Sequence, residues 1–206
     1  MLNVSIWERR ARSTLIEGYA TWVADLMSHG WDGYLATLMF DDLPGSLESQ
    51  IAQMHLGATG MFRRLMTRMV RKPRSPEWSP LLPKGVFAPD LPVSKRRATE
   101  LFRDPPANDG LHLHGIILAS RAGRLTDGLD LHFQQKRAIY LTGRLRTIDV
   151  QRIDRNPEYA TEYALKGLKR PCFGPDHLLV LPRTIDEISQ YKQYNTRSHR
   201  SMEICL

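Results

Sequence analysis

The chain has 206 residues, of which 42% are hydrophobic and 25% charged, a balance typical of a soluble globular protein with an ordinary core. Its 29 Lys and Arg against 22 Asp and Glu give a net charge of +7, which favours a polyanionic partner such as nucleic acid. No apolar run is long enough to cross a bilayer, and the first residues lack the pattern of a secretory signal. The two cysteines, Cys172 and Cys205, are too few and too far apart for a disulfide framework, so we expect a cytoplasmic protein.

The first part of the chain predicts a helix, a buried strand and a second helix. Apolar residues recur at three- and four-residue steps over 4–28, as in an amphipathic helix. Residues 34–40 are a short apolar run that ends in turn-forming residues, which predicts a buried strand. A long helix is expected over 46–72, with Ser46 as its N-cap and a methionine-rich stripe facing the core.

The end of this second helix is strongly basic, with Arg68, Arg71 and Lys72 among its charges. Cations at the C-terminal end of a helix stabilise its dipole, which explains them without any ligand. The same side chains can contact the phosphates of a nucleic acid. We predict a nucleic-acid contact at these three residues, with a simply solvated helix end as the alternative.

The second part of the chain predicts strands that alternate with helices. The order of elements indicates an α+β fold, an antiparallel sheet with helices on one face. Asn156 and Pro157 have the residue types of an N-cap and a first helical position. The expected elements are a proline-rich connection with a short strand near 86–87 (73–94), a buried strand (111–119), a helix (131–146), a strand (147–153), a helix (156 to about 169) and a short helix (185–193).

The first segment that carries chemistry is His112-Leu113-His114, inside the predicted strand 111–119. Residues i and i+2 of a strand point to the same face, so the two imidazoles are expected side by side. Neutral imidazole is the commonest metal-ligating side chain, and two of them leave positions on a divalent ion open for phosphate oxygens. The alternative is a pair of histidines that are hydrogen-bonded at a strand edge.

The second segment is Tyr159-Ala160-Thr161-Glu162-Tyr163-Ala164-Leu165-Lys166. Tyr159 and Tyr163 are four residues apart and share one face of a helix, and Lys166 follows Tyr163 by three residues. The phenolate is the nucleophilic form of tyrosine, and a nearby cation stabilises it. The alternative is an aromatic pair that packs on the sheet beside a solvated lysine.

Taken together, a His-hydrophobic-His strand followed about fifty residues later by a Tyr-x-x-Lys helix resembles the HUH endonuclease superfamily. This superfamily includes rolling-circle replication initiators (Rep proteins), relaxases and single-tyrosine transposases. The strand 34–40 looks like the first motif of the Rep branch. The resemblance covers about 33–169 of a single domain spanning 1–206, so the N-terminal helix (1–30) and a C-terminal extension (171–206) lie outside it.

The resemblance implies a ferredoxin-like or RRM-like sheet with the HxH strand at its centre. It implies that His112 and His114 ligate Mg²⁺ or Mn²⁺, that Tyr163 is the nucleophile and that Lys166 positions or activates it. The implied reaction is nicking and joining of single-stranded or cruciform DNA through a 5′-phosphotyrosine, as in rolling-circle replication initiation. Tyr159 is either a second nucleophile or a residue that packs or stacks on a base.

Three questions stay open in the sequence. The third metal ligand is unassigned, since Glu100, Asp104, Asp109 and Glu162 are placed by no clear motif. No G-x-x-x-x-G-K-[ST] segment is present, so any unwinding would come from a partner such as a host helicase. A non-catalytic nucleic-acid-binding module on a similar sheet is the competing function. A phosphoesterase with two H-x-[ST] segments is excluded because the sequence does not contain two of them.

Overall fold

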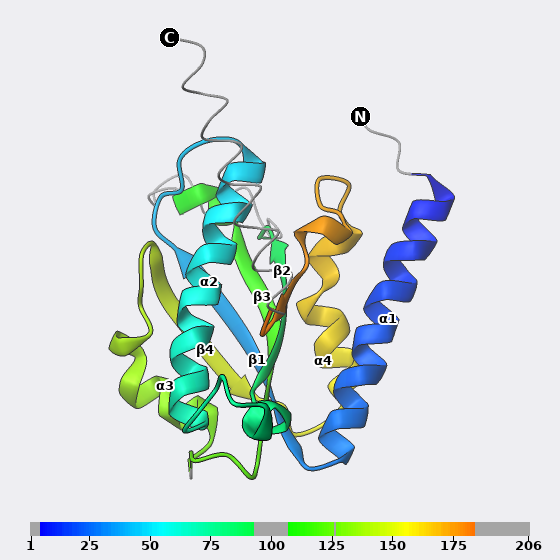
Figure 1. Ribbon diagram of the computed structural model, residues 1–206. Coiled ribbons are helices and arrows are strands. Elements are labelled where there is room, and N and C mark those ends of the chain that lie inside the picture. The colour runs from blue at the N-terminus through cyan, green and yellow to red at the C-terminus, as the bar shows by residue number, and fades with distance from the viewer. Residues whose placement is uncertain (1–4, 93–106, 126, 184–206) are drawn as a thin grey trace.

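The computed structural model describes residues 5–92, 107–125 and 127–183. In this part of the chain five strands form one antiparallel sheet in the order β4-β1-β3-β2-β5. The strand that carries the two histidines, β3, lies at its centre, as predicted (Figure 1). The strands are β1 (Trp31–Phe40), β2 (Lys84–Asp90), β3 (His112–Ser120), β4 (Leu145–Arg152) and β5 (Leu179–Leu181).

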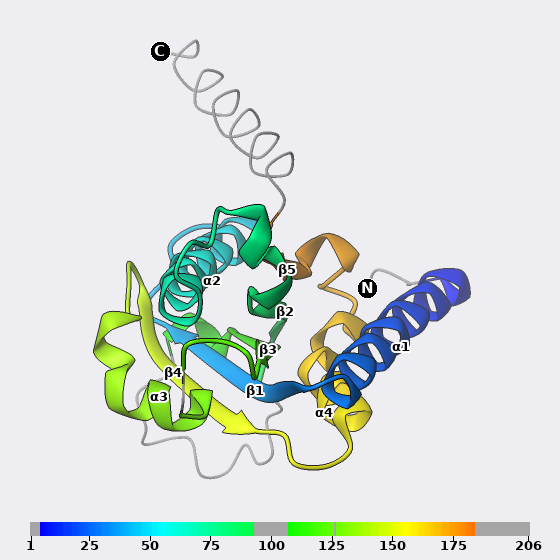
Figure 2. The same ribbon diagram turned by 60° about the horizontal axis from the view of Figure 1, so that its bottom comes forward.

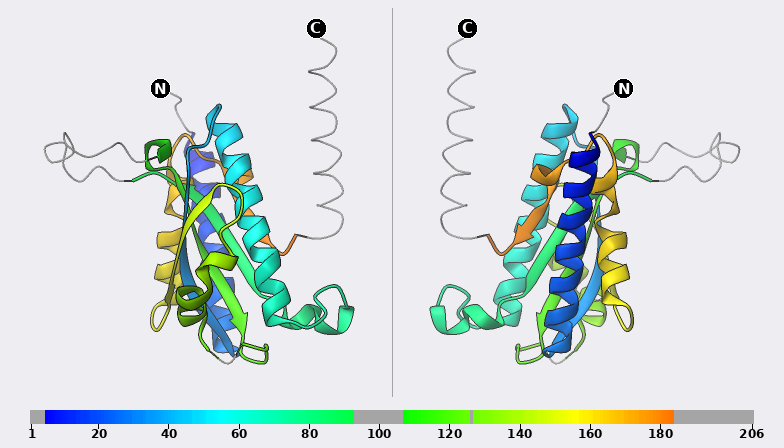
Figure 3. Two further views of the ribbon diagram at one scale, coloured as in Figure 1. Left: turned by 90° about the vertical axis from the view of Figure 1, so that its left-hand side faces the viewer. Right: turned by 90° about the vertical axis from the view of Figure 1, so that its right-hand side faces the viewer.

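Helices cover both faces of the sheet. Figure 2 shows α2 and α3 on one side of the strands, and α1 and α4 on the other. The side views of Figure 3 show α1 and α4 lying next to each other. The α-helices are α1 (Ile6–Ser28), α2 (Leu47–Met69), α3 (Leu129–Lys136) and α4 (Pro157–Ala164), and the 3₁₀ turns are η1 (Pro76–Leu81), η2 (Ala107–Gly110), η3 (Arg137–Ile139), η4 (Lys166–Lys169) and η5 (Pro175–His177).

The expectation of helices on one face is therefore wrong, and the composition of the central strands gives the reason. Along β3, Ile117 faces the core under α2, whereas Ile116 and Leu118 face the core under α1 and α4. A strand that is apolar on both faces needs a covering layer on both sides. The sheet is consequently the middle of three layers.

The helix that carries the two tyrosines begins and ends differently from the prediction. Pro157 occupies the first turn as expected, but Asn156 adopts a left-handed conformation (φ 51°) and its side chain makes no capping hydrogen bond. The α-helix ends at Ala164, and the chain continues as the tighter turn η4 through Lys169. This change of helix type directs Lys166 toward the end of β2.

The other predicted elements are mostly found, with shifted ends. The helix expected over 131–146 is wrong in its second half, because Gly143 has a φ of 58° and β4 already begins at Leu145. The short strand β5 was not predicted. The helix expected over 185–193 lies outside the described residues.

Candidate functional site

Asp90, His112 and His114 form a group whose ligand atoms all lie within 4.8 Å of one another, which could hold a metal ion. Pairing in the sheet brings them together, since Asp90 at the end of β2 is opposite His112 at the start of β3, and Ala88 is opposite His114. All three side chains point to the face covered by α1 and α4, by the alternation of the two strands. Asp90 and His112 are buried, and His114 is half-buried.

Hydrogen bonds orient both imidazoles so that the Nε2 atoms remain for a ligand. His112 Nδ1 donates to the carbonyl of Gly110 at 2.7 Å, and His114 Nδ1 lies 3.3 Å from the hydroxyl of Thr37 on β1. Burial lowers the pKa of His114 to about 4; His112 and Lys166 act in the same direction and Asp90 opposes them. His114 is therefore a neutral imidazole at pH 7, which is the form that binds metals.

The Asp90 carboxylate lies between the histidines and two cations. Its Oδ2 is 2.9 Å from Lys166 Nζ, and its Oδ1 is 3.3 Å from Arg170 Nε. Arg170 Nε is within ion-pair distance but not aligned as a hydrogen-bond donor, so Oδ1 is a buried oxygen without a hydrogen-bond partner among the residues that the structure describes. A buried carboxylate oxygen of this kind fits a divalent cation, since it lies beside two Nε2 atoms that bond to no other residue within 5–92, 107–125 and 127–183.

Tyr163 on α4 lies at the solvent side of this group. Its ring centroid is 5.7 Å from that of His114, in an edge-to-face arrangement, and the residue is 43% exposed. Lys166 Nζ lies 3.8 Å from the centroid of the Tyr163 ring while it also pairs with Asp90. One ammonium thus joins the candidate nucleophile to the candidate metal ligand.

Two glycines permit the close approach of these elements. A Cβ on Gly167 of η4 would be 2.0 Å from the carbonyl oxygen of Pro89, the residue before Asp90. A Cβ on Gly115 of β3 would be 2.5 Å from the carbonyl oxygen of Val86 and closer still to the Phe87 ring. Any larger residue at Gly167 would move η4, and with it Lys166, away from β2.

The structure separates the other predicted site residues from this group. Tyr159 is 71% exposed and makes no hydrogen bond or ring contact with the described residues. Arg68, Arg71 and Lys72 are exposed at the end of α2, across the sheet from Tyr163. They are also at the other end of β3, because the Met69 carbonyl accepts a hydrogen bond from Arg124, which follows that strand. Their assignment to nucleic-acid binding stays a prediction.

Sequence reasoning missed Asp90 and Arg170. Of the acidic residues considered as the third ligand, Glu162 is exposed on α4 and outside the group, while Glu100 and Asp104 lie outside the described residues and nothing is described of the Asp109 side chain. The alternation of Val86, Ala88 and Asp90 was a usable signal, but Pro89 and the other prolines favoured an irregular connection over a strand. Arg170 follows the predicted helix and had no motif to mark it.

Comparison of the chain with family models, with curated proteins and with solved structures found no match. Among the described helices, none combines the length and apolar character that a membrane span requires.

Proposed function

We propose that this protein nicks and rejoins single-stranded DNA with Tyr163 as the nucleophile and a divalent ion, Mg²⁺ or Mn²⁺, at Asp90, His112 and His114. The observation that carries the proposal is the contact of Tyr163 with this group, through His114 on one side and Lys166 on the other. A paired-histidine metal group and a tyrosine-lysine helix arise from distant parts of the sequence, yet they meet at one point on the sheet surface.

The proposed chemistry follows from the positions of these side chains. The bound ion would polarise a scissile phosphate and stabilise charge on its oxygens. The Tyr163 oxygen attacks phosphorus, and the bond from phosphorus to the 3′ oxygen breaks. The tyrosine proton leaves to solvent and the departing 3′ oxygen takes one up, which gives a 5′-phosphotyrosine and a free 3′-hydroxyl. The reverse reaction rejoins the strand without another energy source.

Lys166 has the geometry of a residue that assists this tyrosine. Its ammonium lies over the Tyr163 ring, so a positive charge is close to the side chain that would attack the phosphate. In the described part of the chain, no such cation lies over Tyr159 and no contact links it to the metal group. We therefore favour Tyr163 alone as nucleophile for the first cleavage.

The sheet supports the same proposal. The elements β1-α2-β2-β3-α3-β4, with the sheet order β4-β1-β3-β2, follow the ferredoxin-like arrangement, and α2 and α3 share one face as that arrangement requires. The net charge of +7 suits a DNA partner. Initiation of rolling-circle replication is the biological role we infer, with single-stranded or cruciform DNA as substrate.

The experiment is an incubation of the full chain with a pool of end-labelled single-stranded oligonucleotides and Mn²⁺, followed by a denaturing gel. We expect a labelled covalent adduct with the wild type that is absent in Tyr163→Phe, in His114→Ala and with EDTA. Tyr159→Phe is the matched control and should still form the adduct. Tight binding that needs no metal, without any adduct, would favour a non-catalytic binding module instead.

A further inference from the structure

The N-terminal helix α1 is linked to the candidate site by two partly buried hydrogen bonds of one side chain. Arg12, half-buried on α1, donates from one Nη atom to the carbonyl of Leu168 at 3.2 Å and to the carbonyl of Arg170 at 2.8 Å. Leu168 is in the last part of η4 and Arg170 directly follows it, a region where carbonyl groups have no partner within the turn. Arg12 therefore pairs with the Leu168 carbonyl and shares the Arg170 carbonyl with the backbone N–H of Phe173.

The turn that Arg12 holds carries both cations that contact Asp90. Lys166 is the first residue of η4 and Arg170 follows its last. Arg170 also donates to the carbonyl of Leu91 at 2.6 Å. It therefore connects the end of η4 to the end of β2 through two contacts, one with Leu91 and one with the Asp90 carboxylate. A continuous set of contacts thus runs from Arg12 through η4 to Asp90, and from Lys166 to Tyr163.

η4 is short and is held in place largely by its contacts with β2 and α1. It is a single 3₁₀ turn of four residues, with Leu168 buried in the core between α1 and the sheet. Short 3₁₀ segments have poorer hydrogen-bond geometry than α-helices and depend on outside contacts. Arg12 and the close packing of Gly167 on Pro89 provide such contacts from opposite sides.

We propose that Arg12 is a positioning residue for the reaction: it fixes η4 so that Lys166 stays between Asp90 and Tyr163. The catalytic part of this inference rests on the proposed function, whereas the structural part does not. In this proposal α1 contributes to the geometry of the candidate site, although it lies outside the segment that resembles the HUH nucleases.

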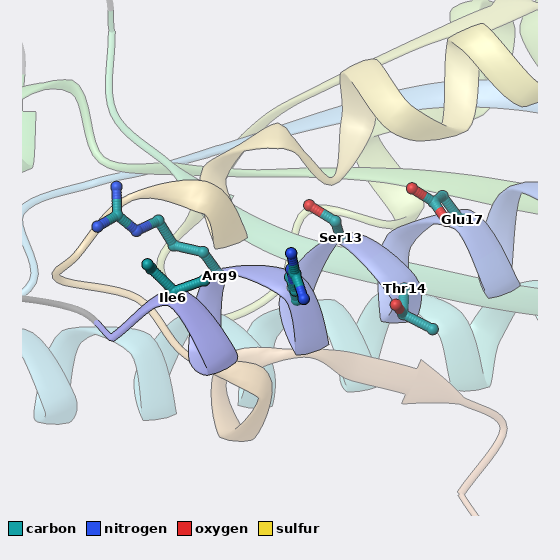
Figure 4. Close-up of a pocket in the computed structure, with 6 residues that line it drawn as sticks. Ile6, Arg9, Ser13, Thr14 and Glu17 are labelled. Carbon is teal, nitrogen blue, oxygen red and sulfur yellow. The ribbon is translucent and has the colours of Figure 1, made fainter.

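Arg12→Met is the test variant, because it keeps the apolar stem and removes the two hydrogen bonds. Arg9→Met is the matched control, since Arg9 is exposed one turn earlier on the same helix, on the rim of a shallow pocket that includes Ile6 and Ser13 (Figure 4). Hydrogen exchange of backbone amides is measured first, without DNA. We expect faster exchange in 166–170 of Arg12→Met, with β2 and β3 unchanged, and no change in Arg9→Met.

The rate of adduct formation is measured next, at saturating Mn²⁺ and oligonucleotide. A displacement of about 1 Å can lower a rate by roughly 100-fold, and a loosened turn should lower kcat by about ten-fold with little change in KM. Arg12→Lys should restore part of the rate, because an ammonium can donate to the same carbonyls.

Unchanged exchange at 166–170, or exchange that rises equally in all strands, would overturn the positioning role. A normal rate despite local loosening would also contradict it, and a wild type without any adduct would instead contradict the proposed function.

Discussion

The two faces of the sheet bury similar apolar side chains, yet only one of them carries a reactive group among the described residues. On the α2 face, a helix of 23 residues covers the strands with a methionine-rich stripe. On the other face, α1 also has 23 residues, but α4 has only eight and is followed by the 3₁₀ turn η4 near the end of β2 and the start of β3. The polar side chains Asp90, His112 and His114 occur where this second layer changes from helix to turn.

Each face of the sheet has a buried histidine, and the two differ in their hydrogen-bond partners. His55 on α2 has its Nε2 atom 3.2 Å from the His177 carbonyl, and burial lowers its pKa to about 4. His112 uses Nδ1 for a carbonyl and has no hydrogen bond from Nε2 to any residue in the described ranges. The first is a histidine satisfied by the fold, and the second retains a lone pair for a ligand. Hydrogen-bond partners therefore distinguish the two faces better than burial does.

The largest effect that separates the faces is expected from Asp90→Asn. Removing the only carboxylate of the group should weaken Mn²⁺ binding by more than about 100-fold, since loss of an outer-shell partner alone costs roughly 10–100-fold. Calorimetric titration with Mn²⁺ measures this directly. Asp149→Asn is the matched control, because Asp149 is an exposed carboxylate on the same face, two strands from His114.

Loss of the Asp90 charge also leaves Lys166 and Arg170 without their partner, so the variant is checked for folding by thermal melting. His114→Gln keeps both ion pairs and should lose Mn²⁺ binding as well. If either folded variant binds Mn²⁺ as the wild type does, the metal group is not at this position.

A somewhat smaller effect is expected from Gly167→Ala, which tests the close packing of η4 against β2. The new Cβ would meet the Pro89 carbonyl oxygen at 2.0 Å, so the turn must shift. Overpacking of this kind costs about 1–3 kcal/mol of stability, and the shift should reduce the adduct rate by roughly 100-fold. Single-turnover kinetics and a melting curve measure the two quantities. Gly174→Ala serves as the control, because its new Cβ would have no atom of the described residues within 4 Å. Equal behaviour of the two variants would contradict the role of Gly167.

The smallest effect at the site is expected from charge reversal on the opposite face. Arg68→Glu with Arg71→Glu should leave the adduct rate on a short oligonucleotide within about two-fold. A short substrate bound only on the site face is far from these two charges, and salt screens most of their electrostatic effect over that distance. With long single strands, the same variant should bind more weakly. The salt dependence of that binding should flatten by roughly 0.7 for each phosphate that the variant no longer neutralises. An unchanged salt slope would remove these arginines from the DNA-binding surface.

Much of the framework was predictable because it depends on local patterns. The strand with His112 and His114 shows its apolar run directly, and Ser46 caps α2 as its residue type indicates. Asp90 was not predicted, because its role depends on pairing between β2 and β3, and pairing between strands is not a local property. The second helical layer was also missed. The apolar character of Ile116 and Leu118 implies some cover, but does not say which helices provide it.

The register of β2 and β3 has one more consequence, in the thermodynamics of the sheet. Asp90 is opposite His112, so a slip of one residue would turn the carboxylate to the other face. An ion that needs all three side chains binds only the native register, and its binding free energy therefore adds to the stability of that pairing. At a metal concentration of 100 times Kd this linkage amounts to about 2.7 kcal/mol. The same ion that we propose for catalysis would thus favour correct strand pairing in the centre of the fold.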